Sequence, residues 1–240
     1  HPHPKDFAIE RFTRVQPFPH DEWHERLETP KVTFIWREDR LWGDQGNLGH
    51  LRRLANRLRV KMGLSDLSLP RREQTRRVVL LAIHLRKAFP KLTFAVVGLG
   101  MPGDMPHWIE DLRTIAIDTA VEKMWCGRYA DSQVVIGIHG SNMLLPSAHA
   151  GATVELMLSE RWGNMIQDLL MPDLDCRETL FRYRIVPVSV SVQELTFMIV
   201  SLLYSYHFME RDFRHRLINH DPDNFTEIHR HQLLYKVGSS

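Results

Sequence analysis

One stretch of the chain, residues 131–158, constrains the fold more than any other. It begins with the β-branched run Val134–Val135–Ile136, which is typical of a buried parallel strand. The run leads into His139–Gly140–Ser141–Asn142, where Gly140 permits a tight turn and Ser141 or Asn142 can cap a helix. Free amide groups and the positive end of a helix dipole meet at such a turn, so the stretch predicts an anion site.

The helix after this turn is expected from about Met143 to Gly151, and a strand over 154–158 follows it. Other apolar runs predict strands at 31–37, 92–98, 114–117 and 181–188. Apolar spacing and helix-terminal residues predict helices at 47–62, 70–89, 119–130 and 191–211, with a further short helix after the segment SERWGNM. This alternation predicts an α/β fold with a doubly wound, mainly parallel Rossmann-like sheet. In that sheet, strands 32–36, 92–98, 134–138 and 153–158 should be neighbours.

Three regions are expected along the chain. Residues 1–30 are rich in Pro, His and aromatic residues, and are expected to form an irregular arm or the remnant of a preceding domain. Residues 31–211 should form the Rossmann-like domain. Residues 212–240 are polar and contain several His, and a loose helix or tail is expected there.

The composition excludes several classes of protein. The formal net charge is only +2, which gives no argument for nucleic acid binding. The chain has 2 Cys and no CxxC motif, so neither a disulfide framework nor a Cys-based zinc site is indicated. The first residues, HPHPKDF, lack the apolar core of a signal peptide, and the apolar stretch 195–204 is too short to span a bilayer. A cytoplasmic protein is expected.

A glycine-rich loop follows the strand at 92–98. Its sequence, GLGMPGDMP, partly matches the dinucleotide-binding pattern. However, Gly103 is followed by Asp, Met and Pro rather than by the start of a helix, so the spacing argues against a nicotinamide site.

The block VVIGIHGSNMLLPSAHAGATVEL resembles the signature of the family 61 glycosyltransferases, known as the DUF563 group. In that family a strand runs into His-Gly-Ala-x-Leu, and a later strand ends in Val-Glu-Leu. The segment TFIWREDR at 33–40 also resembles the Arg-containing strand and loop that open the family's donor half. The likeness covers about residues 31–200. Ser141 and Asn142 depart from the family's usual Ala and Gly, and Ala148 replaces a frequent Phe.

The resemblance implies the donor-binding half of a two-domain GT-B enzyme. Such an enzyme transfers a sugar, with inversion, from a nucleoside diphosphate sugar to a glycan or protein acceptor. Uridine is the expected base, and no cofactor or metal is required. The resemblance also implies an acceptor domain, which residues 1–30 are too short to supply. An inverting transfer needs a general base, and because that group can come from the acceptor half, none is assigned.

Cations and amides are needed to hold the departing diphosphate. Arg37 and Arg40 can bind phosphate oxygens bidentately, although they could instead pair with Glu38, Asp39 or Asp44. Gly140, Ser141 and Asn142 can supply the amides, or simply cap a helix.

Three further residues at strand ends are candidates. His139 is the candidate catalytic residue, because it could donate to phosphate or polarise the acceptor, and the alternative is a buried His satisfied by the backbone. Glu155 could accept hydrogen bonds from the ribose, or pair with Arg161. Asp118 could lie near the base or ribose, or cap a helix.

No metal site is expected. Asp173 and Asp175 lie in a Pro-containing loop away from the strand ends. Trp42 and Trp162 lie in expected loops, where they could stack on a base or sugar or belong to the core.

Two other functions stay open. One is a non-catalytic module with the same fold that binds a nucleotide or another polyanion. The other is an interaction domain whose basic helix face at 47–61 contacts a partner protein or, peripherally, an anionic membrane.

Overall fold

The computed structural model describes residues 13–43, 68–165 and 181–218. Within these ranges the chain forms a six-stranded sheet in which all neighbouring strands are parallel. The strands are β1 (Lys31–Trp36), β2 (Thr93–Leu99), β3 (Ile109–Thr114), β4 (Val134–Ile138), β5 (Ala152–Met157) and β6 (Tyr183–Pro187). Their order is β3-β2-β1-β4-β5-β6. The predicted doubly wound, Rossmann-like α/β fold is therefore confirmed.

β1 and β4 pair at the centre of the sheet, in register from Val32–Val134 to Ile35–Gly137. The chain continues from β1 to β2 on one side and from β4 to β5 on the other. The strand order therefore reverses between β1 and β4. In open α/β sheets, ligands bind beyond the carboxyl ends of the strands at such a switch point. The predicted neighbours, now seen as β1, β2, β4 and β5, are confirmed.

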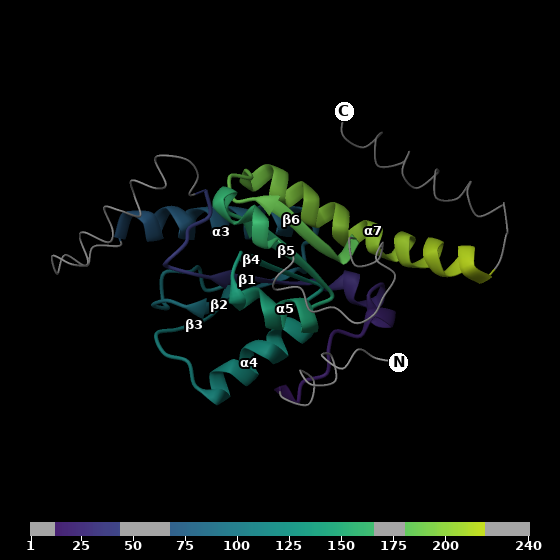
Figure 1. Ribbon diagram of the computed structural model, residues 1–240, viewed down its shortest axis with the longest axis horizontal. Helices are drawn as coiled ribbons and strands as arrows, with labels where there is room; N and C mark the ends of the chain where they lie inside the picture. The colour runs from purple at the N-terminus through teal and green to yellow at the C-terminus, as the bar shows by residue number, and fades with distance from the viewer. Residues whose placement is uncertain (1–12, 44–67, 166–180, 219–240) are drawn as a thin grey trace.

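Helices cover both faces of the sheet (Figure 1). The α-helices are α3 (Ser68–Ala88), α4 (Thr119–Ala130), α5 (Leu144–His149) and α7 (Val192–Ile218). The 3-10 helices are η1 (His20–Glu22), η2 (Glu25–Glu28), η3 (Ser141–Met143) and η4 (Ser159–Asn164). α3 and α7 lie on one face, and α4 and α5 lie on the other.

Each strand contributes side chains to both faces of the sheet, because successive side chains in a strand point in opposite directions. Phe34 of β1 points to the face covered by α3 and α7, where it packs in one cluster with Leu81 and Ile199. Ile35 points to the other face and packs in a second cluster with Trp125 of α4. All five are buried, so the central strands are apolar on both faces, as buried parallel strands require.

The segment before β1 packs on the domain. Phe18 and Trp23 are 2% and 1% exposed and belong to the main core cluster. The backbone N–H of Phe18 donates to the carbonyl of His149 over 2.8 Å, and Trp23 Nε1 donates to the carbonyl of Leu203 over 3.1 Å. Residues 13–30 therefore contribute to the core of the Rossmann-like domain.

The strand predicted at 114–117 is wrong in position. β3 spans Ile109–Thr114, and the residues after it form an exposed loop in which Ile115 and Ile117 are 73% and 51% exposed. The charged residues in the sequence IEDLRT interrupt the apolar pattern from which a strand is predicted, so the sequence did not indicate β3. Its charges are tolerated at the edge of the sheet because Arg113 bonds to Asp111 of the same strand.

Several boundaries differ from the predictions. α7 continues to Ile218 rather than ending near 211, and the segment SERWGN itself forms η4. The helix predicted at 47–62, the short helix predicted after SERWGNM, the loop with Asp173 and Asp175, and most of the predicted tail lie outside the described residues. In the described part of the chain, no helix is both long and apolar enough to cross a membrane.

Candidate functional site

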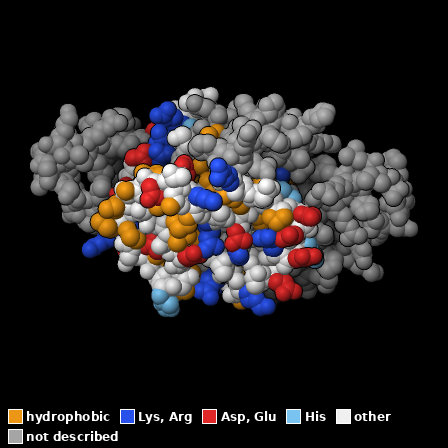
Figure 2. Space-filling model, turned by 90° about the horizontal axis from the view of Figure 1, so that it is seen from below, with side chains coloured by type: hydrophobic (Ala, Val, Ile, Leu, Met, Phe, Trp, Pro, Cys, Tyr) orange, Lys and Arg blue, Asp and Glu red, His pale blue; other side chains and the backbone are white. Residues whose placement is uncertain are grey.

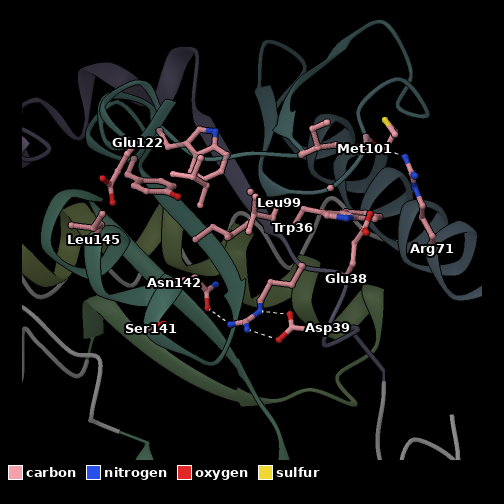
Figure 3. A pocket seen from close by; sticks show the side chains of 18 residues that line it. Trp36, Glu38, Asp39, Arg71, Leu99, Met101, Glu122, Ser141, Asn142 and Leu145 are labelled. Carbon is pink, nitrogen blue, oxygen red and sulfur yellow. Dashed lines mark hydrogen bonds and ion pairs between the residues drawn. The ribbon is translucent and has the colours of Figure 1, made fainter. Parts of the chain in front are cut away.

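A cavity of 1030 Å³ lies at the carboxyl ends of the central strands (Figure 3). Its walls come from the ends of β1 and β2, from the segments after β1, β2 and β3, from η3 and α5, and from residues of α3 and α4. The lining residues are Ile35, Trp36, Arg37, Glu38, Asp39, Arg71, Gly98, Leu99, Gly100, Met101, Ile115, Ile117, Glu122, Trp125, Tyr129, Ser141, Asn142 and Leu145. The cavity thus occupies the switch point between β1 and β4.

Arg37 and Asn142 meet in this cavity. Arg37 follows β1 and donates through Nη1 to Asn142 Oδ1, which lies just after β4. The same guanidinium also donates two hydrogen bonds to Asp39, from Nε to Oδ1 over 2.8 Å and from Nη2 to Oδ2 over 2.6 Å. The parallel pairing of β1 and β4 carries both residues to the same edge of the sheet. The predicted proximity of Arg37 to the turn after β4 is therefore observed.

Arg40 reaches the same turn from the other side. Its Nη1 donates to the carbonyl of His139. Both guanidinium groups lie close to Gly140, which has a φ of 149°, in the region that favours glycine. A Cβ at Gly140 would collide with Arg37 and lie 3.0 Å from Arg40 Nη1. Glycine at this position therefore allows two arginines to converge on one turn.

Positive charge is crowded at this point. Burial, and next the positive charge of Arg37, lower the pKa of Arg40. The hydrogen bonds from Arg37 lower the pKa of Asp39, although its partial burial opposes this. Asp39 is the carboxylate that faces both arginines, and its side chain is 60% exposed. Arg161 and Glu160 also act on Arg40, with opposite charges. An added anion would therefore be attracted here, because Asp39 and Glu160 do not balance the three guanidinium groups of Arg37, Arg40 and Arg161.

His139 and Glu155 form a buried pair that does not line the cavity. His139 is 4% exposed and Glu155 is 1% exposed. His139 Nδ1 lies 2.7 Å from Glu155 Oε1, and the Tyr183 hydroxyl donates to Glu155 Oε2 over 2.6 Å. These contacts differ from both sequence hypotheses for Glu155, which were a ribose and Arg161. They fix the strand end that leads into the Gly140 turn.

Three other candidates lie away from the cavity lining. Asp118 caps α4, because its Oδ1 accepts the N–H of Val121 over 2.8 Å. Trp42 is 3% exposed, stacks on Phe34 and donates to the carbonyl of Val190, so it belongs to the core. Trp162 lies in η4 and is 40% exposed. For Asp118 and Trp42, the structure thus gives the role that the sequence left as the alternative.

The loop after β2 is held in place by a buried arginine. The Arg113 side chain is 0% exposed and lies over the Trp36 ring, with Cζ 4.5 Å from the ring centroid. It bonds to Asp111 within β3 and to Asp104 in the loop, and Asp104 also accepts from Arg71. Partial burial of the two carboxylates is the largest influence and opposes their ionisation. The hydrogen bonds and positive charge of Arg113, together with other nearby donors, outweigh it and lower the pKa of both.

The end of the cavity beside α4 is mainly apolar. Trp125 and Leu145 form its base, while Leu99, Ile115 and Ile117 stand at its rim with exposed fractions of 46% or more. Figure 2 views the molecule from the side that carries α4, and there hydrophobic side chains gather beside mixed charges. The cavity therefore combines a charged centre with an apolar end.

The sequence missed several lining residues, notably Trp36, Glu38 and Arg71. A signal existed for the first two, because they flank Arg37 at the end of a predicted strand. Arg71 gave no such signal, since only the packing of α3 brings it to the cavity.

Within the described ranges, no cluster of three or more His, Cys, Asp or Glu side chains has a geometry that could hold a metal ion. In comparisons with known proteins, no family model and no curated protein matches the chain.

Replacing Glu155 by leucine should destabilise the protein. The change leaves His139 Nδ1 and the Tyr183 hydroxyl without their carboxylate partner in a buried place, which costs about 2 kcal/mol or more of unfolding free energy. Thermal and urea unfolding measure this loss. Glu28→Leu, at an exposed position of η2, is the control and should change stability by no more than about 0.5 kcal/mol. Equal stability of the two variants would contradict a structural role for the pair.

Arg113→Met should destabilise the protein in a pH-dependent way. At pH 7 the loss should be on the order of 3 kcal/mol, because the partly buried carboxylates lose their partner. The folded-state pKa values of Asp104 and Asp111 are lowered. Their stabilising contribution is therefore complete above the unfolded value of about 3.9 and is lost as the pH falls through the folded values.

The difference in stability between Arg113→Met and the wild type should accordingly shrink below about pH 4. Unfolding by urea across a pH series provides the measurement. Arg86→Met is the matched control, since Arg86 also lies over a tryptophan, Trp108, but at the surface. A pH-independent loss in Arg113→Met would contradict the ion-pair explanation.

Proposed function

We propose that the cavity binds a nucleoside diphosphate sugar and that the chain is the donor-binding part of an inverting, metal-independent glycosyltransferase. The observation that carries this proposal is the meeting of Arg37 and Asn142 at the switch point of the sheet, inside a cavity of 1030 Å³. Pockets for small molecules and cofactors measure about 300–1,000 Å³, so the cavity has room for a ligand of this size.

The charged centre supports binding of the diphosphate. A guanidinium has five N–H donors, and the Arg37 side chain is 19% exposed, so it can bind a ligand from the cavity. A diphosphate would compete with the exposed Asp39 for these donors and would relieve the repulsion between Arg37 and Arg40. The backbone of Ser141 and Asn142 lies beside the same point and would add amide donors to those of the arginines.

The apolar end supports binding of the base. Trp125, Leu145, Ile115 and Ile117 provide flat or branched apolar surface, and the exposed rim residues would be removed from water by a planar ring. Burial of apolar surface contributes about 25 cal/mol per Å². Uridine is the base that the resemblance to family 61 implies.

The chemistry of transfer follows from the charged centre. The acceptor oxygen forms a bond to the anomeric carbon while the bond from that carbon to the diphosphate oxygen breaks. The electron pair stays on the diphosphate, and the acceptor proton passes to a base. Arg37 would stabilise the negative charge that develops on the leaving group, and Arg40, which does not line the cavity, would add positive charge from behind it. Such stabilisation typically accounts for much of an enzyme's rate.

A non-catalytic nucleotide-binding module is the second candidate function. It is favoured by the position of His139, the candidate catalytic side chain, which is paired with Glu155 and does not line the cavity. Release of UDP from a UDP-sugar separates the two functions. Slow hydrolysis of the donor supports the glycosyltransferase, and stable binding without release supports the module.

UDP should bind the wild-type protein, and Arg37→Met should weaken binding about tenfold or more, because charge-assisted hydrogen bonds contribute about 1.5–3 kcal/mol. Calorimetric titration with UDP, and with ADP and GDP for comparison, measures the affinity. EDTA should leave the affinity for UDP nearly unchanged, as expected if arginines rather than a metal hold the diphosphate.

Arg76→Met is the matched control, because Arg76 lies on α3 with a side chain that is 67% exposed and does not line the cavity. Its affinity for UDP should equal that of the wild type. Absence of UDP binding by the wild type, or equal binding by the wild type and Arg37→Met, would contradict the proposal. A more than tenfold loss on chelation, which is about 1.4 kcal/mol, would contradict metal independence.

A further inference from the structure

Two polar atoms in the wall of the cavity have no hydrogen-bond partner among the described residues. They are Trp36 Nε1, a donor, and Glu38 Oε1, an acceptor, and both atoms are buried. Trp36 as a whole is 1% exposed, and both residues line the cavity. Because buried polar groups in proteins nearly always have partners, an unpaired donor beside an unpaired acceptor indicates a missing interaction.

The two atoms face one place beside Gly100. A Cβ added to Gly100 would lie 2.7 Å from Trp36 Nε1 and 3.0 Å from Glu38 Oε1. Both atoms therefore pack close to the Gly100 backbone, where only a residue without a side chain fits. Figure 3 shows the Trp36 ring and Glu38 together on one wall, away from the Asp39 and Asn142 contacts.

Trp36 Nε1 and Glu38 Oε1 together favour a ligand group that can both accept and donate a hydrogen bond. A hydroxyl can accept from the indole N–H and donate to the carboxylate at the same time. A phosphate oxygen could accept from Trp36, but it would be repelled by Glu38, which has no ion-pair partner in the described part of the chain. Apolar groups would leave both atoms unpaired.

The other carboxylates of the cavity are less suited to this role. Asp39 is held by two hydrogen bonds from Arg37. Glu122 lies in the first turn of α4, near the apolar end. Glu38 therefore combines a position in the cavity, an unpaired acceptor atom and an adjacent donor.

We propose that Trp36 and Glu38 form a subsite for one hydroxyl group of a sugar ring. This inference rests on the proposed binding of a nucleoside diphosphate sugar and adds an orientation to it. The base lies at the α4 end, the diphosphate lies at Arg37, and a hydroxylated ring reaches Glu38 beside the glycine loop. The hydroxyl belongs either to the ribose or to the transferred sugar.

Titration of Glu38→Gln with two probes, UDP and UDP-glucose, tests the subsite. If the hydroxyl belongs to the ribose, the affinity for UDP should fall about tenfold, which is about 1.4 kcal/mol. Forms of UDP that lack the 2′ or the 3′ hydroxyl identify the group, because the wild type should bind one of them about tenfold more weakly than UDP. Glu38→Gln should bind that form and UDP almost equally.

If the hydroxyl belongs to the transferred sugar, Glu38→Gln should bind UDP like the wild type and UDP-glucose about tenfold more weakly. Gly100→Ala is a second variant. Its added methyl group would collide with the Trp36 ring and lie 3.0 Å from Glu38 Oε1, so it should displace both side chains and weaken binding of the same probe. Glu25→Gln, at an exposed position in η2, is the control for loss of a carboxylate and should bind both probes like the wild type.

The possible failures can be told apart. If the wild type binds UDP but Glu38→Gln binds UDP, its deoxy forms and UDP-glucose like the wild type, the subsite is refuted while the proposed function stands. If the wild type binds neither UDP nor UDP-glucose, the proposed function fails and the subsite fails with it.

Discussion

β1 and β4 lie side by side at the centre of the sheet, and their parallel pairing determines where the charged residues of the site lie. Each strand ends in a short polar segment, and the shared register brings Arg37 next to Asn142 although the two are 105 positions apart in the chain. A shift of one residue in this register would turn every side chain of the shifted strand to the opposite face. The buried apolar residues on both faces therefore fix the geometry of the site as well as the fold.

The arginines on the two sides of the cavity differ in how fully nearby carboxylates neutralise them. Beside β2 and β3, Arg113 is enclosed and neutralised by Asp104 and Asp111, so it holds a loop and is not available to a ligand. After β1, Arg37 and Arg40 converge on Gly140 and share the exposed Asp39. The first arrangement stabilises a wall of the cavity, and the second leaves the positive charge of Arg37 within it and that of Arg40 beside it. This contrast is the physical basis for placing an anion at β1 and β4.

The sequence predicted the parts of this structure that depend on local patterns. Apolar runs located the central strands, and the turn at Gly140 indicated an approach of Arg37 that the structure contains. The pairing of Glu155 with Tyr183 could not be predicted, because it depends on the register between β5 and β6. The sequence could not distinguish the role of Glu38 from that of Asp39, because only the fold brings Glu38 Oε1 close to Trp36 Nε1.

The central claim is that the switch point between β1 and β4 holds a diphosphate. A crystal structure of the protein grown with UDP tests this most directly, because it locates the ligand as well as detecting it. The account predicts density for the two phosphates within hydrogen-bonding distance of the Arg37 guanidinium and the backbone of Ser141 and Asn142, with the base toward Trp125. Density for UDP at another surface, with Arg37 still bound only to Asp39 and Asn142, would contradict it.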